Sequence, residues 1–148
     1  MLSAMSLVDL TERAADADIR SVLSALAWTG EPDHIDRIVG TYATGPRLFG
    51  FEARGRIVGV IGIENVHKGD GVICHIAVEP AARRSGVGRA MVDEAMDRLA
   101  LRSLTAETDA DAIGFYRSCG FTIQSLGEKY PGVKRFLCER RRPDSTNR

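Results

Sequence analysis

The chain has 148 residues, the length of one ordinary domain, and its 20 Lys and Arg residues balance its 20 Asp and Glu residues. This neutral charge excludes a general attraction for nucleic acid or for an acidic membrane surface, so any anion site must be local. No apolar run approaches the roughly 20 residues that a membrane-spanning helix needs, and the first residues lack the layout of a secretory signal. We therefore expect a single cytoplasmic domain over residues 1–148, with a core from about 6 to 140 and a polar tail over 141–148.

The first half of the chain predicts a strand, two helices and then three strands. Residues 6–12 alternate enough for a short strand, and residues 13–28 and 33–43 carry apolar side chains at helical spacing. Residues 47–80 are typical of three strands, because glycine-containing turns that permit a positive φ divide them. An antiparallel meander is the simplest arrangement of these strands.

The second half predicts two more helices among further strands. Residues 86–101 have the apolar period of a helix packed on a sheet, and residues 103–108 are a strand candidate. Residues 109–120 predict a helix that starts with an Asp cap and stops at a glycine, and residues 121–140 predict a closing hairpin. The resulting order, βααβββαβαββ, is a mixed α/β layout with only one βαβ crossover, around the first of these two helices.

The segment RRSGVGR, residues 83–89, separates a predicted strand from a predicted helix. A helix starts with unpaired backbone N–H groups and the positive end of its dipole, and Gly86 and Gly88 leave room there for an anion. The three arginines add charge-assisted donors that suit a pyrophosphate. A tight turn with solvated arginines explains the same residues equally well. A Walker-type loop is excluded because no Gly-Lys-Ser/Thr follows, and a dinucleotide fingerprint is disfavoured because its third glycine is missing.

Two segments resemble the same protein family. Arg83-x-x-Gly86-x-Gly88 is similar to the acyl-CoA binding signature, Gln/Arg-x-x-Gly-x-Gly/Ala, of the GNAT superfamily of N-acyltransferases. Residues 109–121, DADAIGFYRSCGF, resemble the family segment Asn-x-x-Ala-x-x-x-Tyr-x-x-x-Gly-Phe. The resemblance covers the chain from about residue 6 to 140. It implies an α/β (α+β) fold, with a mixed, mainly antiparallel central sheet of six to seven strands flanked by four helices.

The resemblance also implies where acetyl-CoA, the cosubstrate, binds. We call residues 83–89, the segment expected to hold the pyrophosphate, the cradle. In this family the strand before the cradle splays from its neighbour, and its backbone pairs with the pantetheine arm as an added strand does. Here this assigns the pantetheine contacts to Ile76, Ala77 and Val78, and the oxyanion contact to a backbone N–H of Val78 or Ile76. Asp109 stands where the family often has an Asn that contacts the cofactor, and an Asp carboxylate cannot donate a hydrogen bond. The pyrophosphate is expected on the backbone amides of Arg84, Ser85, Gly86, Val87, Gly88 and Arg89, with Arg83 beside them.

Tyr116 matches the family tyrosine that protonates the departing thiolate, and its plainer interpretation is a core tyrosine. A general base is also needed, and no motif assigns it. Glu64, at the end of the third strand, is our first candidate, followed by His75 and Glu107. Each has a simpler interpretation: Glu64 and Glu107 as solvated strand ends, and His75 as a hydrogen-bonded, half-buried imidazole.

These residues predict an acetyl-CoA-dependent N-acetyltransferase that acts by direct attack of a primary amine, without a metal ion or a covalent enzyme intermediate. Cys119 has no patterned His partner, so we discount it as a nucleophile, and the three cysteines are expected to be buried free thiols. The acceptor is an amine-bearing small molecule or a peptide. Trp28, His34 and Tyr42, with the segment 127–136, are candidates to line its pocket.

Two other classes of function stay open. The first is a catalytically inactive CoA-binding or protein-interaction module on the same fold, against which the presence of Tyr116 argues. The second is a nucleic-acid binder that uses the arginine cluster, against which the neutral net charge argues. No nucleic-acid or membrane partner is therefore expected. The oligomeric state stays open, and a homodimer is one alternative because dimers are common in the family.

Overall fold

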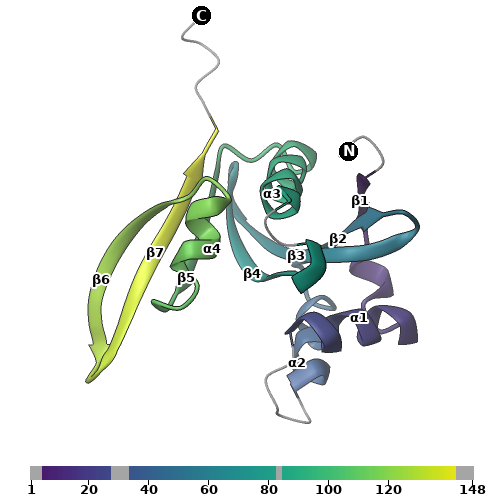
Figure 1. Ribbon diagram of the computed structural model, residues 1–148, viewed down its shortest axis with the longest axis horizontal. Coiled ribbons are helices and arrows are strands. Elements are labelled where there is room, and N and C mark those ends of the chain that lie inside the picture. The colour runs from purple at the N-terminus through teal and green to yellow at the C-terminus, as the bar shows by residue number, and fades with distance from the viewer. Residues whose placement is uncertain (1–4, 28–33, 83–84, 143–148) are drawn as a thin grey trace, which may run out of the picture.

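The structure is a computed structural model that describes residues 5–27, 34–82 and 85–142. Its centre is a seven-stranded sheet with the order β1-β2-β3-β4-β5-β7-β6 (Figure 1). The strands are β1 (Met5–Asp9), β2 (Arg47–Ala53), β3 (Arg56–His67), β4 (Asp70–Val78), β5 (Ser103–Thr108), β6 (Thr122–Tyr130) and β7 (Val133–Arg141). The helices are α1 (Ala17–Ala27), α2 (His34–Thr41), α3 (Val87–Arg98) and α4 (Ile113–Ser118), with short 3-10 turns η2 (Thr11–Arg13) and η3 (Pro80–Ala82). Within the described ranges, no helix is long and apolar enough to cross a membrane.

The strand connections explain the mixed sheet. β1 to β4 pair as an antiparallel meander, and β7 pairs antiparallel with both β5 and β6. β4 and β5 are parallel because α3 forms the crossover between them. The predicted element order, the mainly antiparallel sheet and the four helices are therefore confirmed.

Helices cover both faces of the sheet. α3 and α4 pack on one face, and α1 and α2 pack on the other. The side chains of β3 alternate between the two cores: Ile61 and Ile63 lie under α3, and Val60 lies under α1 and α2. Burial of one such side chain stabilises the fold by about 1.5–3 kcal/mol relative to leaving it exposed. Figure 1 shows α3 and the α1–α2 pair on opposite sides of strands β2 to β4.

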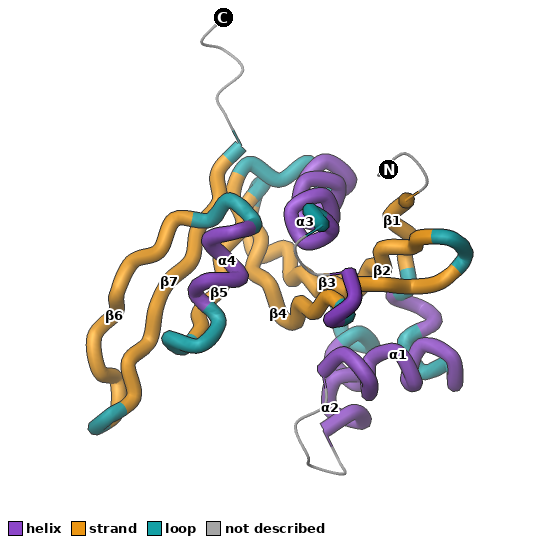
Figure 2. The backbone as a smooth tube through the Cα atoms, viewed as in Figure 1, coloured by secondary structure: helices purple, strands orange, loops and turns teal. Residues whose placement is uncertain are grey.

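β4 and β5 pair only over a short stretch. Residues 70–72 of β4 pair with residues 103–105 of β5, and the ladder stops there although β4 continues to Val78. Cys74 is an extra residue in β4 opposite β3, a β-bulge that bends the strand just past this point. Figure 2 shows β5, β6, β7 and α4 diverging from β4. The sheet therefore opens into a V along β4, as the family resemblance implies.

The start of α4 differs from its prediction. Its N-cap residue is Ala112, and no side chain caps the helix. Asp109 Oδ1 instead accepts a hydrogen bond of 3.0 Å from the backbone N–H of Asp111, which forms an Asx turn before the helix. The predicted Asp cap is therefore wrong, because this carboxylate bonds within the preceding turn.

The C-terminal end is held more firmly than a polar tail. β7 runs to Arg141, in the ladder with β5. Beyond it, Arg142 Nε donates to the carbonyl oxygen of Leu101 at 3.0 Å, and its Nη2 lies 2.9 Å from a carboxylate oxygen of Asp97. The predicted tail is therefore wrong for Arg141 and Arg142, and residues 143–148 lie outside the described part of the chain.

Candidate active site

A groove runs along the open part of β4, from the start of α3 to α4. It consists of a cavity of about 540 Å³ next to α3 and a cavity of about 480 Å³ farther along β4. Val78 and Phe115 line both cavities, which are therefore adjacent parts of one groove. The remaining lining residues are Gly86, Gly88, Arg89, Gly114, Ser118 and Cys119 in the first cavity, and Cys74, His75, Ile76, Ala77, Thr108, Ala112 and Tyr116 in the second. The groove thus brings together residues predicted from the cradle, from β4 and from α4.

The α3 end of the groove is open in front of the helix. Gly86 is the N-cap of α3 in a left-handed conformation, with φ 84° and ψ 4°, which glycine adopts without strain. A Cβ atom on Gly86 would meet no atom of the described residues within 4 Å. The first backbone N–H groups of any α-helix have no intrahelical partner, and in α3 no side chain caps them. This arrangement suits an anion. Arg83 and Arg84 lie outside the described residues, Ser85 is exposed, and the side chain of Val87 is buried in the core.

Gly88 has a second reason to be glycine. A Cβ atom there would lie 2.9 Å from Cys119 Sγ and 3.4 Å from the ring of Phe115. The missing side chain therefore lets α3 approach the end of α4 closely. The sequence alone predicted only that Gly88 leaves room for an anion.

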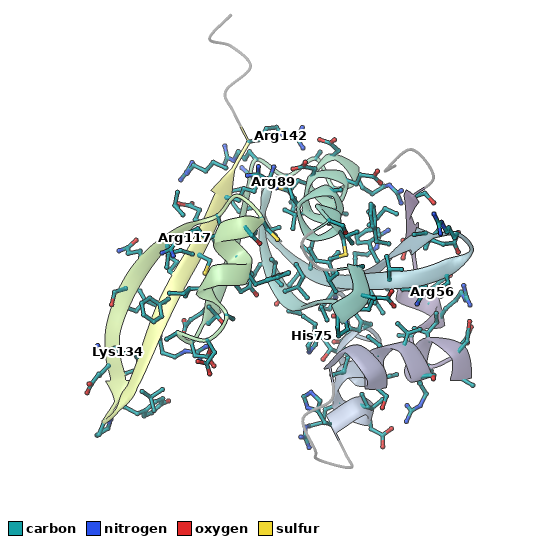
Figure 3. The ribbon with its side chains drawn as sticks, in the orientation of Figure 1. Arg56, His75, Arg89, Arg117, Lys134 and Arg142 are labelled. Atoms are coloured by element: carbon teal, nitrogen blue, oxygen red, sulfur yellow. The ribbon has the colours of Figure 1, made fainter. Side chains whose placement is uncertain are left out.

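Arg89 reaches from the first turn of α3 to the end of α4. Gly120 has a φ of 93°, and a Cβ atom on it would lie 2.6 Å from Arg89 Nη2. Arg140 reaches the same place, where its guanidinium donates to the carbonyl oxygen of Cys119 at 3.1 Å and pairs with Asp93 of α3. Figure 3 shows Arg89 at this junction. Among the described cradle residues, Arg89 supplies the guanidinium that lines the groove.

The wall of the groove along β4 is formed by Ile76, Ala77 and Val78. The side chains of Ile76 and Val78 pack in the core under α3, and Ala77 packs in the core under α1 and α2. Their side chains are thus used for packing. The predicted role of these residues, in which only backbone groups contact a ligand, is compatible with this packing.

Tyr116 lies on α4 and lines the second cavity. Its side chain is 7% exposed and packs edge-on against Phe115 and Phe121, with ring centroids 5.5 and 5.3 Å apart. Burial, and to a smaller extent the neighbouring Cys138 and Cys119, raises the pKa of Tyr116 to about 12. The phenol therefore keeps its proton at neutral pH, as a proton donor must.

Neither of the two carboxylates proposed as bases lines the groove. Glu64 is exposed on β3, and it is not among the residues that line either cavity. Glu107, at the end of β5, is 3.2 Å from Arg135 Nε and 3.3 Å from Lys129 Nζ. The hydrogen bonds from Arg135 and Lys129 lower the pKa of Glu107 below its ordinary value. Glu107 is therefore a weaker proton acceptor than an unpaired carboxylate.

His75, the third base candidate, lines the second cavity and has a partner that the sequence did not reveal. Its Nδ1 is hydrogen-bonded to the hydroxyl oxygen of Tyr42 at 2.7 Å. Tyr42 follows α2 and is buried in the core under α1 and α2. A Cβ atom on Gly62 would lie 1.6 Å from that hydroxyl oxygen, so the contact requires a glycine in β3. A glycine inside a strand pattern indicates a close approach, and Gly62 is such a signal, but the glycine alone does not identify Tyr42 as the partner.

The remaining predicted residues contribute less to the groove. Asp109 is exposed and lines neither cavity. Trp28 lies outside the described residues, and His34 is the first residue of α2. Cys119 is buried, and burial raises the pKa of its thiol. Across residues 5–27, 34–82 and 85–142, no group of three or more His, Cys, Asp or Glu side chains could hold a metal ion.

The sequence model of the Acetyltransferase (GNAT) family matches residues 13–121, which include the cradle, β4 and α4. The chain belongs to this family. The groove along β4 is thus the candidate active site of a GNAT acetyltransferase domain, and the family resemblance drawn from two short segments is confirmed.

One curated relative of this GNAT chain is the UPF0157 protein YqkA of Bacillus subtilis (strain 168). The two are 30% identical over 101 residues, which make up 65% of this chain and 29% of that protein. The chain therefore spans less than a third of the length of this relative.

Solved structures share the GNAT fold at low sequence identity. A protein described as a GNAT-family acetyltransferase from Desulfovibrio desulfuricans is 20% identical, with a TM-score of 0.73 over 93% of this chain and 99% of that one. A GNAT family acetyltransferase from Elizabethkingia anophelis with acetyl-CoA bound is 16% identical, with a TM-score of 0.66 over 94% and 99%. Mutant forms of the spermidine/spermine N-acetyltransferase SpeG from Vibrio cholerae are 14% identical, with a TM-score of 0.67 over 94% of each chain. At these identities the comparisons show the fold.

Proposed function

We propose that this protein transfers the acetyl group of acetyl-CoA to the nitrogen of a primary amine, by direct attack within a ternary complex. The observation that carries the proposal is the position of Tyr116, a protonated phenol that lines the groove between β4 and α4. The GNAT neighbour that holds acetyl-CoA and the neighbour named for spermidine and spermine support the choice of cosubstrate and of an amine acceptor.

The groove fits an acyl-CoA at both of its ends. The open, uncapped start of α3 at Gly86 would hold the pyrophosphate through backbone N–H groups, with Arg89 beside it. The pantetheine arm would lie along β4, where the ladder with β5 has stopped and Ile76, Ala77 and Val78 offer their backbone. Acetyl-CoA supplies the thioester whose acetyl group is transferred.

Tyr116 would supply the proton that the leaving sulfur needs. A thiolate leaves more readily when a hydrogen-bond donor meets its developing charge, and the buried phenol is such a donor. Burial raises the pKa of Tyr116, and the same apolar surroundings disfavour a charged thiolate. The proton would therefore be carried either by the phenol oxygen of Tyr116 or by the sulfur of CoA. The amine must in turn lose a proton, because only its neutral form has a lone pair for attack.

A panel of acceptors tests the proposal. Purified protein is incubated with acetyl-CoA and, separately, with spermidine, an aminoglycoside, a free amino acid and a peptide with a free N-terminus, and the release of CoA thiol is measured. We expect turnover with at least one acceptor and a product carrying one acetyl group on nitrogen by mass spectrometry. Acetyl-CoA binding without turnover on every acceptor would instead identify an inactive CoA-binding module.

A further inference from the structure

His75 lines the groove and is hydrogen-bonded to the buried Tyr42, and neither residue belongs to the two segments that resemble the family. His75 follows the bulged Cys74 in β4 and stands opposite Gly62 of β3. The bulge shifts the alternation of β4, so that His75 faces α1 and α2 at the point where the sheet opens. Figure 3 shows His75 on the side of β4 that lies toward these helices.

Tyr42 is held in a position to orient the imidazole. Its ring is 4% exposed, and its centroid is 5.7 Å from that of His75, with 57° between the ring planes. The hydroxyl group occupies the space that a side chain at position 62 would fill. Within the described part of the chain, the other ring nitrogen of His75, Nε2, has no hydrogen-bond partner. The pair therefore fixes Nδ1 and leaves Nε2 for another group.

The surroundings keep this histidine neutral. Burial, and then the nearby His34 of α2, lowers the pKa of His75 below its ordinary value. The other titratable groups around it are Tyr42, Cys74 and, across the same cavity, Tyr116. Burial raises the pKa of each, so none of the three carries a charge at neutral pH. The charge of Glu64 in β3 contributes to the raised pKa of Cys74. His75 thus has a lone pair at neutral pH.

His75 and Tyr116 approach the groove from opposite faces of the sheet. Both line the second cavity, but Tyr116 belongs to the core under α3 and α4, whereas the partner of His75 belongs to the core under α1 and α2. Acyl transfer needs a proton donor at the leaving sulfur and a proton acceptor at the attacking nitrogen. Two groups on opposite walls of one cavity can meet these two atoms separately.

We propose that His75 accepts the proton of the attacking amine through Nε2, and that Tyr42 is the positioning residue that accepts a hydrogen bond from Nδ1–H. This inference rests on the proposed function. The nitrogen lone pair forms the new C–N bond as the C–S bond breaks. One N–H bond of the amine breaks and its proton passes to Nε2, while the sulfur receives a proton from Tyr116. The imidazolium that forms keeps its Nδ1–H bond to Tyr42, and both side chains return to their starting state by exchange with water.

The same geometry ranks His75 above Glu64, the first candidate from the sequence. Glu64 is exposed and stands opposite Val72, where β4 and β5 are still paired and the sheet has not yet opened. His75 lies past the bulge, in the open part of the groove. Two residues of β4, Ile73 and the bulged Cys74, separate the closed ladder from the proposed base.

Kinetics of matched variants test the assignment in the full chain, with the best acceptor from the panel. For His75→Gln we expect kcat to fall about 100-fold or more, the usual contribution of a general base, with acetyl-CoA affinity unchanged by calorimetry. Tyr42→Phe keeps the buried ring and removes only the hydroxyl, and we expect a loss of about 10-fold in kcat, typical for a group that orients a histidine. A larger loss for Glu64→Gln than for His75→Gln would overturn the proposal while leaving the acetyltransferase function intact.

Nitrogen NMR of the ring provides a readout that does not depend on turnover. In uniformly ¹⁵N-labelled protein we expect His75 Nδ1 to be protonated and Nε2 to be unprotonated at pH 7.5, with the signals assigned by their loss in His75→Gln. Tyr42→Phe should lower the pKa of His75 further, because the imidazolium loses its acceptor. An Nε2–H tautomer, or a pKa that does not change in Tyr42→Phe, would contradict the proposal even if no acceptor is found. Absence of turnover with the expected tautomer would count against the proposed function alone.

Discussion

At the α3 end of the groove, the proposed phosphate-binding groups follow one another along residues 83–89. At the other end, the proposed catalytic residues and the residues that position them come from four separate segments. Tyr42 follows α2, Gly62 lies in β3, His75 in β4 and Tyr116 in α4. The first end needs only a helix start and a glycine with a positive φ. The second end exists only when both layers of helices have packed on the sheet.

This difference affects how each end responds to mutation. Backbone N–H groups at a helix start cannot be deleted by a side-chain change, so the α3 end is lost only when something blocks it or repels the anion. The other end, which holds the proposed catalytic residues and which we call the chemical end, depends on single atoms. One example is the Tyr42 hydroxyl oxygen, 2.7 Å from His75 Nδ1. Loss of one atom there should reduce the rate and leave cofactor binding unchanged.

The largest expected effect is that of Gly86→Glu on the α3 end. The new side chain would enter the open space in front of α3 with a negative charge, and loss of two charge-assisted hydrogen bonds corresponds to about 4 kcal/mol, or about 1,000-fold in affinity for CoA. Isothermal titration calorimetry with CoA measures it. Gly55→Glu is the matched control, because Gly55 also has a positive φ, 79°, and open space around it, in the β2–β3 turn away from the groove. Equal CoA affinity in both variants would remove the proposed phosphate site.

Tyr116→Phe should affect the chemical end alone. Loss of the proton donor is expected to lower kcat about 100-fold, with CoA affinity within a factor of two of the parent protein, since the aromatic packing against Phe115 and Phe121 is kept. Steady-state kinetics and calorimetry measure the two quantities. A variant with full activity would assign the proton donor elsewhere.

Gly88→Ala separates the two proposed roles of Gly88, which are to leave room for an anion and to let α3 approach the end of α4. The added methyl group would press on Cys119 Sγ at 2.9 Å, and we expect the free energy of unfolding to fall by about 1–3 kcal/mol. Urea unfolding of Gly88→Ala, Cys119→Ala and the double variant gives the coupling between the two positions. We expect the double variant to be more stable than the sum of the single changes predicts, because the clashing sulfur is gone. Unchanged stability together with weaker CoA binding would mean that Gly88 serves the anion alone.

The smallest expected effect is on the pH dependence of stability. The folded protein lowers the pKa of His75 below its ordinary value of 6.5, so the unfolded chain takes up the proton first as the pH falls. The contribution of His75 to the free energy of unfolding should therefore be constant above about pH 6.5 and decrease below it, through the pKa of the folded state. Glu79 and Glu107, whose pKa values are lowered from 4.5, act only at lower pH. Urea midpoints at pH 7.5 and 5.5 should differ less in His75→Gln than in the parent, and an equal difference would exclude His75 as the source.

The order of elements and the positions of the cradle and of Tyr116 could be predicted because each rests on a local pattern. Apolar periodicity located the helices and strands, and two short segments located α3 and α4 relative to the groove. The Asp cap of α4 and the tail from residue 141 were wrong, because Asp109 bonds within its own turn and Arg142 bonds to Leu101. In both cases the apolar pattern was interpreted correctly, but the hydrogen-bond partner of a polar side chain could not be predicted from it.

The sequence by itself determined the α3 end, because a strand, two glycines and an amphipathic helix in succession specify both the backbone conformation and the charge there. Only the tertiary structure decided the chemical end. The bulge at Cys74, the close approach of Tyr42 to Gly62 and the cavity that His75 shares with Tyr116 join residues from 42 to 116 along the chain. Such contacts depend on how two helix layers pack against one sheet, and packing is a property of pairs of residues that no local pattern encodes.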